Sequence, residues 1–267
     1  MIDGAAAVSG QPKSPGNRLD RALEQRRPAL IGYLPLGDPA MPRGLAELYV
    51  KGGIDVLEIG LPVPNPYLDG PTIRESMRRV GEANIGAREL AGLTARLRRR
   101  HPAQAIVWMS YGPAMRAEEL VRLAGRASID GVLFVEPARY FGGLSSQLEA
   151  LGVHLLHFLA RELSEPDVAA ARHSGGYVML SATAGVTGAG HGRRKLPDST
   201  PLIQRLRGAG VSTPVALGIG IHSPAQARDA VEMGADAVVI GSELVRQAAV
   251  GRSAVAEYLA ALREAVS

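Results

Sequence analysis

The chain has 267 residues, of which 46% are hydrophobic and 21% are charged, and its formal net charge is +4. This composition is typical of a folded α/β protein and excludes a mainly disordered chain. The absence of cysteine excludes disulfides, a thiolate nucleophile and cysteine-ligated zinc. The length allows two small domains or one large α/β barrel.

The basic clusters at residues 96–100 and 193–195 lack interleaved aromatic side chains. Such clusters are more typical of solvated faces than of nucleic-acid sites, so we expect no nucleic-acid partner. No apolar run reaches the roughly 18 residues of a membrane span, and the N-terminus lacks the apolar region of a signal peptide. We therefore expect a cytoplasmic protein with no membrane partner. Residues 1–17, rich in Ala, Gly, Ser and Pro, are interpreted as a flexible N-terminal tail.

Eight short apolar runs predict strands along the rest of the chain. Their near-continuous apolar character is typical of parallel strands that are covered on both faces. Most are separated by the length of one βα unit, with longer gaps after the second and the sixth. The eight runs are residues 29–34, 54–60, 105–110, 130–135, 153–158, 176–181, 214–220 and 236–241.

Helical periodicity fills the intervals, for example at 44–53, 117–127 and 223–235, and predicts one long terminal helix at 242–265. Eight strands and about eight helices predict a single (β/α)8 TIM barrel domain over residues 18–267, with a parallel eight-stranded core. An open doubly wound sheet would more usually show five or six strands and an early glycine fingerprint. The sequence has neither.

Two carboxylates are predicted at the catalytic end of this barrel. Glu58 lies near the end of the second strand, and Asp69 lies in the long proline-rich loop that follows. Chemistry in such barrels occupies the carboxyl ends of the strands and the loops after them. The alternatives are a buried Glu58 paired with Arg or Lys, and an Asp69 that caps the turn before Gly70.

Small residues follow the last three predicted strands. Gly220, Gly241, Ser242 and the glycines of the 185–192 loop lie where a strand turns into a helix. Glycine lets a backbone approach a ligand closely, and N–H groups at a helix N-terminus bind anions. Each glycine alone could be only a tight-turn residue, but together they predict a site for a phosphorylated small molecule.

The histidines do not form a metal motif. His154 and His157 lie three apart in one predicted strand, so their side chains point to opposite faces. His191 and His222 lie in catalytic-end loops without an identifiable partner. We expect no metal and no cofactor, and the simplest chemistry for the two carboxylates is acid/base catalysis.

The runs LPLGDP, VLEIGLPVPNPYLDGPTIR, AGVTG and IGS together resemble the tryptophan synthase alpha subunit family, in order and in spacing. The resemblance implies a (β/α)8 barrel that cleaves indole-3-glycerol phosphate by a retro-aldol reaction, without a cofactor. It implies that Glu58 is the general acid/base and that Asp69 binds the indole N–H. The substrate-binding positions that it implies are Tyr33, Thr187, Gly188, Gly220, Gly241 and Ser242.

This chemistry requires a proton on indole C3 and removal of a proton from the adjacent hydroxyl, which one carboxyl group can serve in turn. A second, ionised carboxylate stabilises positive charge at the ring nitrogen. We expect an apolar barrel mouth to raise the pKa of Glu58 and a solvated loop to leave Asp69 ionised.

The chain departs from the family pattern in its lid loops. Asn65 stands where the family usually has an aspartate, and either Tyr111 is displaced by one residue or Ser110 replaces the family tyrosine near the third strand. Three readings stay open: an alpha subunit that docks on a PLP-dependent beta subunit, a stand-alone lyase acting on indole-3-glycerol phosphate or a related compound, and a non-catalytic partner-binding barrel. The retained carboxylates argue against the third.

Overall fold

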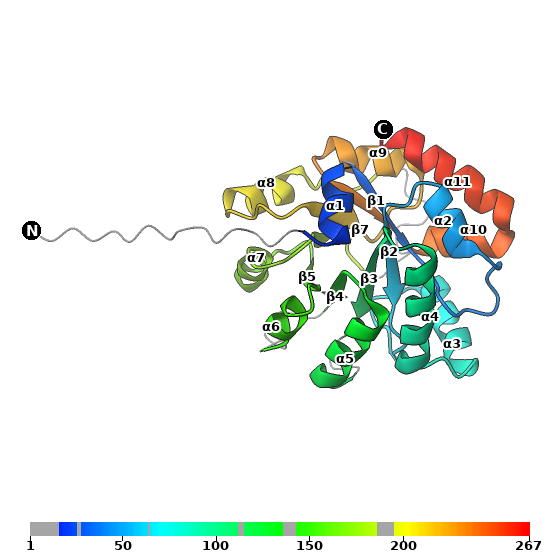
Figure 1. The fold of residues 1–267 in the computed structure, drawn as a ribbon. Helices are drawn as coiled ribbons and strands as arrows, with labels where there is room; N and C mark the ends of the chain where they lie inside the picture. Colours follow the sequence, from blue (N-terminus) through cyan, green and yellow to red (C-terminus); the bar gives the residue numbers. More distant parts are fainter. Residues whose placement is uncertain (1–15, 26–27, 64, 112–114, 136–142, 186–194) are drawn as a thin grey trace, which may run out of the picture.

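The computed structural model describes residues 16–25, 28–63, 65–111, 115–135, 143–185 and 195–267. Its strands form a closed parallel barrel in which every strand pairs with its neighbours in chain order, and β8 closes on β1. The prediction of a (β/α)8 barrel is therefore confirmed (Figure 1). The strands are β1 Ala29–Tyr33, β2 Val56–Gly60, β3 Ala105–Ser110, β4 Gly131–Phe134, β5 His154–Leu159, β6 Val178–Ser181, β7 Val215–Gly218 and β8 Ala237–Ile240.

The helices of the described chain surround the barrel. Local sequence explains their starts: Ser223 caps α9 by accepting a hydrogen bond from Gln226 N, and Pro224 follows at the first helical position, where no N–H is needed. The helices are α1 Arg18–Gln25, α2 Leu45–Lys51, α3 Pro71–Glu82, α4 Ala87–Arg100, α5 Ala117–Ala127, α6 Leu144–Glu149, α7 Glu165–Ala171, α8 Thr200–Gly208, α9 Pro224–Glu232, α10 Ser242–Val250 and α11 Arg252–Ala265.

The prediction of one long terminal helix is wrong. The segment is split at Gly251, which ends α10 and precedes α11. Gly251 has a φ of 142°, a backbone conformation that glycine adopts at little cost and other residues rarely adopt. The break lets α11 turn back and pack on α2 and α9.

The apolar core has two layers. One cluster fills the space between the strands and the outer helices, and includes the fully buried Trp108. The other fills the barrel interior, and includes Ile31, Val107 and Met179 from the strands. Parallel strands covered on both faces explain why the sequence showed near-continuous apolar runs rather than alternation.

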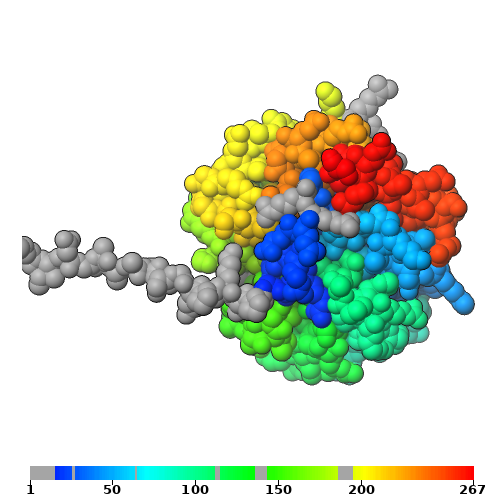
Figure 2. Space-filling view, turned by 45° about the horizontal axis from the view of Figure 1, so that its top comes forward, coloured from blue at the N-terminus to red at the C-terminus, as the bar shows by residue number. Residues whose placement is uncertain are grey.

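Helix α1 closes the end of the barrel at which the strands begin. Its Leu19 and Leu23 belong to the interior cluster, and Leu19 packs against Gly176 and Gly131, where a β-carbon would lie 2.5 and 3.4 Å from Leu19 Cδ2. In Figure 2, α1 lies near the centre of a ring of elements that follow one another in chain order. The opposite end, where the strands finish, is therefore the open one.

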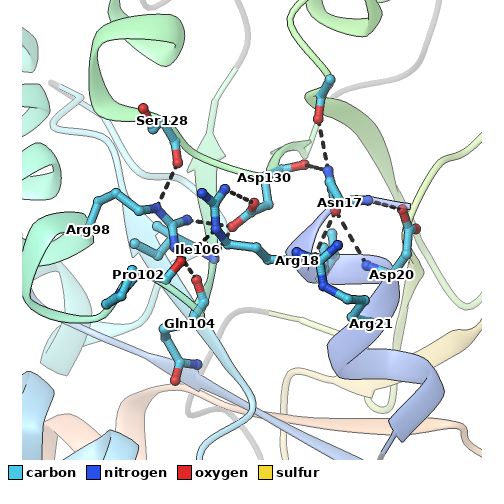
Figure 3. A network of polar contacts seen from close by, with 12 residues as sticks. Asn17, Arg18, Asp20, Arg21, Arg98, Pro102, Gln104, Ile106, Ser128 and Asp130 are labelled. Atoms are coloured by element: carbon cyan, nitrogen blue, oxygen red, sulfur yellow. Dashed lines mark hydrogen bonds and ion pairs between the residues drawn. The ribbon is translucent and has the colours of Figure 1, made fainter. Parts of the chain in front are cut away.

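Ion pairs anchor α1 to this end (Figure 3). Asp130, 1% exposed, accepts hydrogen bonds from Arg98 Nη2 at 2.6 Å, Arg18 Nη1 at 3.1 Å and Ile106 N at 2.8 Å. Asn17 Oδ1 caps the helix by accepting from Leu19 N at 2.8 Å. The interpretation of residues 96–100 as a solvated face is wrong for Arg98, which is buried because Asp130 compensates its charge.

Candidate active site

Glu58 points into the open end of the barrel from β2, beside Tyr33 of β1, its register partner. It is 2% exposed, and its Oε2 accepts a hydrogen bond from Tyr177 Oη at 3.0 Å. Burial raises the pKa of Glu58 to about 7, although the Tyr177 bond lowers it, and the charge of Asp69 raises it further. Within the described residues Glu58 has no ion pair with Arg or Lys, so it can both hold and release a proton near neutral pH.

Asp69 comes from the loop between β2 and α3, immediately before Gly70, which caps α3. It is 2% exposed, so the expectation of a solvated loop is wrong for this side chain. Tyr111 Oη donates a hydrogen bond of 2.6 Å to Asp69 Oδ2, and burial raises the pKa of Tyr111, which keeps it protonated as a donor. Tyr111 itself, and not Ser110, therefore supplies this hydroxyl.

The loop that carries Asp69 is held by its own turns and by α3. Asp69 N donates to Pro66 O at 3.0 Å, and Arg74 of α3 donates to Pro66 O and Tyr67 O, each at 3.3 Å. The Tyr67 ring meets the Tyr111 ring edge-on, with centroids 5.1 Å apart. Asn65, in the same loop, is exposed. These contacts fix the direction in which Asp69 enters the barrel.

The two carboxylates share one pocket, with about 560 Å³ of space that includes some open to solvent. Its walls are mainly apolar, as small-molecule sites usually are, with few polar groups. The pocket is lined by Tyr33, Glu58, Leu68, Asp69, Ile73, Met109, Tyr111, Val135, Phe158, Met179, Ile219, Gly220, Ile221, Val239, Gly241 and Ser242.

Gly220, Gly241 and Ser242 line this pocket from the ends of β7 and β8. Gly220 has a φ of 100°, and a β-carbon there would lie 2.4 Å from Thr183 Oγ1, so both conformation and space require glycine. At Gly241 a β-carbon would meet nothing nearer than Tyr33 Cβ at 3.9 Å. Gly241 caps α10, whose first N–H groups are therefore available to an anion in the pocket.

Other predicted positions lie elsewhere. Thr187, Gly188 and His191 fall outside the described residues. His154 Nε2 contacts Asp20 of α1 at 2.8 Å. His157, three residues later in the same strand, is buried, and its side chain points to the opposite face of the sheet. Among the described residues, no group of three His, Cys, Asp or Glu side chains could hold a metal ion. The same part of the chain has no helix long and apolar enough to cross a membrane.

Sequence analysis missed Tyr177. It is fully buried beneath the pocket and reaches Glu58 across the barrel from the start of β6. The available signal was the alternation in residues 176–181, because Tyr177 and Met179 share the inward face. The alternation shows that Tyr177 points inward, but it does not show that its hydroxyl meets Glu58 on another strand.

The fold and the site define a (β/α)8 barrel protein with two buried carboxyl groups in one pocket at the carboxyl ends of its strands. A family model described as tryptophan synthase alpha chain matches residues 19–266. The chain belongs to the tryptophan synthase alpha chain family.

Named relatives and solved structures agree with this assignment. The tryptophan synthase alpha chain of Chromobacterium violaceum is 35% identical over 82% of this chain and 85% of the relative. That of Novosphingobium aromaticivorans is 32% identical over 93% of this chain and 96% of the relative. The tryptophan synthase alpha subunit of Legionella pneumophila shares 25% identity with a TM-score of 0.78, covering 94% of this chain and 99% of that one. A Mycobacterium tuberculosis tryptophan synthase structure, 24% identical with a TM-score of 0.82 over 94% of this chain and 99% of that one, shows the fold.

Proposed function

We propose that Glu58 and Asp69 are the catalytic residues with which this chain performs the reaction of its family. That reaction is the retro-aldol cleavage of indole-3-glycerol phosphate to indole and glyceraldehyde 3-phosphate, a carbon–carbon lyase step of tryptophan biosynthesis. The observation that carries the assignment is the arrangement of two buried carboxyl groups in one apolar pocket, with a helix N-terminus at its other side.

Glu58 supplies both proton transfers. Its protonated form donates to indole C3, which removes the aromaticity of the five-membered ring and weakens the bond from C3 to the glycerol chain. The carboxylate so formed accepts the proton of the hydroxyl on the adjacent carbon, the carbon–carbon bond breaks, and that carbon becomes the aldehyde. Glu58 ends protonated again, so no net proton is consumed. A pKa of about 7 suits a group that must give and take a proton near neutral pH.

Asp69 has a different task. During cleavage, positive charge develops at the indole nitrogen, and a carboxylate that accepts the N–H hydrogen bond stabilises it. Within the protein, Tyr111 Oη already donates a hydrogen bond to Asp69 Oδ2. An ionised carboxylate can accept several hydrogen bonds, so Asp69 is proposed to accept the indole N–H in addition to the bond from Tyr111. Apolar walls that exclude water strengthen this interaction.

The phosphate is proposed to bind beside Gly220, Gly241 and Ser242, where backbone N–H groups at the start of α10 favour an anion. Tyr33 is proposed to contact the substrate between the phosphate and the carboxylates. Thr187 and Gly188, which the family resemblance assigns to a closing loop and to the phosphate, stay proposals outside the described residues. No cofactor is proposed, because acid/base groups supply every proton transfer.

The family assignment also supports a partner. We propose that a PLP-dependent tryptophan synthase beta subunit binds this chain and receives its indole, in the cytoplasm, and that residues 18–267 form one domain. Residues 1–15 of the predicted tail lie outside the described residues, whereas Asn17 caps α1 and is not part of a flexible tail. The alternative, a stand-alone lyase, is favoured by Asn65 at a lid position where the family usually has an aspartate.

The test is an indole-release assay on indole-3-glycerol phosphate, with and without a beta subunit. Glu58→Gln and Asp69→Asn keep the shape of each side chain and remove its acid/base or charge function, so both should lower kcat by at least a hundredfold. Strong activation by the beta subunit supports the complex, and an unchanged rate supports the stand-alone enzyme. Indole release that survives in Glu58→Gln refutes the assignment.

A further inference from the structure

Tyr33 carries a polar group that the reaction described above does not use. The side chain is 4% exposed and lines the pocket together with both carboxylates. Within the described residues its hydroxyl makes no hydrogen bond. Because Tyr33 lines the pocket, its hydroxyl can hydrogen-bond a ligand that enters there.

The backbone makes room for this hydroxyl. A β-carbon added to Gly60, two residues beyond Glu58 in β2, would lie 2.5 Å from Tyr33 Oη. The phenol ring therefore extends from β1 across to the end of β2, and its oxygen occupies the space of the missing side chain at position 60. Inward-facing side chains of a strand recur every second residue, so this position is one layer nearer the pocket mouth than Glu58.

The ring also lies between the two ends of the proposed substrate. Its β-carbon is beside Gly241, where a β-carbon would lie 3.9 Å away, at the proposed phosphate end. Its hydroxyl is close enough to Asp69 and Glu58 for both charges to raise its pKa, after burial, which has the largest effect. The hydroxyl is thus a neutral donor, placed where the chain between the phosphate and the indole must pass.

We propose that Tyr33 is a substrate-positioning residue whose hydroxyl donates a hydrogen bond to the oxygen on the carbon next to indole C3, the oxygen that becomes the aldehyde oxygen. This inference rests on the proposed function. Glu58 removes the proton of that substrate hydroxyl, while Tyr33 keeps its own proton throughout. Because the substrate oxygen gains electron density as it loses its proton, the hydrogen bond from Tyr33 is stronger in the transition state than in the bound substrate.

The proposal also implies a preference among ligands. The hydroxyl of Tyr33 recognises an indolyl alkyl phosphate that carries a hydroxyl beside the ring, and it gives no advantage to one that lacks it. Packing of the phenol ring against the alkyl chain is the same for both compounds. The hydrogen bond and the packing can therefore be measured separately.

The experiment measures binding by calorimetry in a Glu58→Gln background, which prevents turnover, with and without Tyr33→Phe. The two probes are indole-3-glycerol phosphate and 3-(indol-3-yl)propyl phosphate, which lacks the hydroxyls. We expect Tyr33→Phe to weaken binding of the first about tenfold, the usual effect of one lost hydrogen bond, and to leave the second within twofold. In the otherwise unchanged enzyme, Tyr33→Phe should lower kcat/KM for indole release at least tenfold.

The matched control is Tyr49→Phe. Tyr49 is fully buried among the outer-layer residues, away from the pocket, and its hydroxyl also lacks a partner within the described residues. This control should change neither affinity nor rate. Equal losses for both probes would reduce Tyr33 to a packing role, and an unchanged affinity for indole-3-glycerol phosphate would overturn the proposal. Indole release by the unmodified chain is measured in parallel. If the unmodified chain releases indole, a negative result for Tyr33→Phe overturns only the role of Tyr33; if it releases none, the proposed function itself fails.

Discussion

Replacing Glu58 with glutamine should stabilise the protein, and more so as the pH rises. Burial of Glu58 raises its pKa from 4.5 to about 7. Between these values the folded chain holds a proton that the unfolded chain has released, so the free energy of unfolding falls as pH rises through this window. The loss of unfolding free energy caused by ionising Glu58 is nearly absent below pH 4.5 and nearly complete above about pH 7. Glutamine has no charge to bury, and its amide oxygen can still accept the Tyr177 hydrogen bond.

The magnitude follows from the two pKa values. At about 1.4 kcal/mol per pKa unit, the difference between 4.5 and about 7 corresponds to about 3–4 kcal/mol, most of which develops between pH 4.5 and pH 8. The free energy of unfolding of Glu58→Gln, minus that of the unmodified chain, should therefore increase by about 3 kcal/mol between pH 4.5 and pH 8. This is a large fraction of the 5–15 kcal/mol by which domains are typically stable.

Urea denaturation followed by circular dichroism at several pH values measures this difference. Glu149→Gln makes the same chemical change on the exposed face of α6 and serves as the control, with a difference near zero at every pH. The free energy of unfolding can be plotted against pH for Glu58→Gln and for the unmodified chain. If the two plots run parallel from pH 4.5 to pH 8, the pKa of Glu58 is not raised in the folded state, and its proposed role fails.

Three further predictions concern the surroundings of Glu58 and the two ends of the barrel. Tyr177→Phe removes a hydrogen bond that lowers the pKa of Glu58, so the alkaline fall of kcat/KM should move to higher pH; an unmoved profile contradicts this. Gly241→Ala places a methyl group in open pocket space, so KM should rise at least tenfold with an unchanged melting temperature, whereas Gly220→Ala should lower stability by about 1–3 kcal/mol because of its positive φ. Asp130→Asn leaves buried arginine charge uncompensated and should cost about 3–5 kcal/mol in urea denaturation; a loss below 1 kcal/mol would show that the network is not stabilising.

The barrel could be predicted from the sequence because each strand carries its own signal. A run such as 105–110 is apolar at every position, and this pattern depends only on local residues that are covered on both faces. Glu58 and Asp69 could be assigned to the catalytic end for the same reason, since the order of strand and loop fixes which end they occupy. Gly251 was visible in the sequence, but a glycine within a helical pattern does not reveal whether the helix continues through it.

The apolar surroundings of Glu58 were predicted, but the burial of Asp69 and the partners of both carboxyl groups were not, because they depend on side chains from distant strands. Asp69 is buried by contact with Tyr111, 42 residues away, and Glu58 meets Tyr177, 119 residues away. Only the closure of the barrel brings these pairs together. A local pattern predicts which residues point inward but not which of them meet.

The pH dependence of kcat/KM for indole release tests the central claim most directly, because it reports the pKa of the catalytic group in the free enzyme. If protonated Glu58 starts the reaction, kcat/KM should fall tenfold per pH unit above a midpoint of about 7. A rate that stays constant from pH 6 to pH 9 would contradict the assignment of Glu58 as the acid that protonates indole C3.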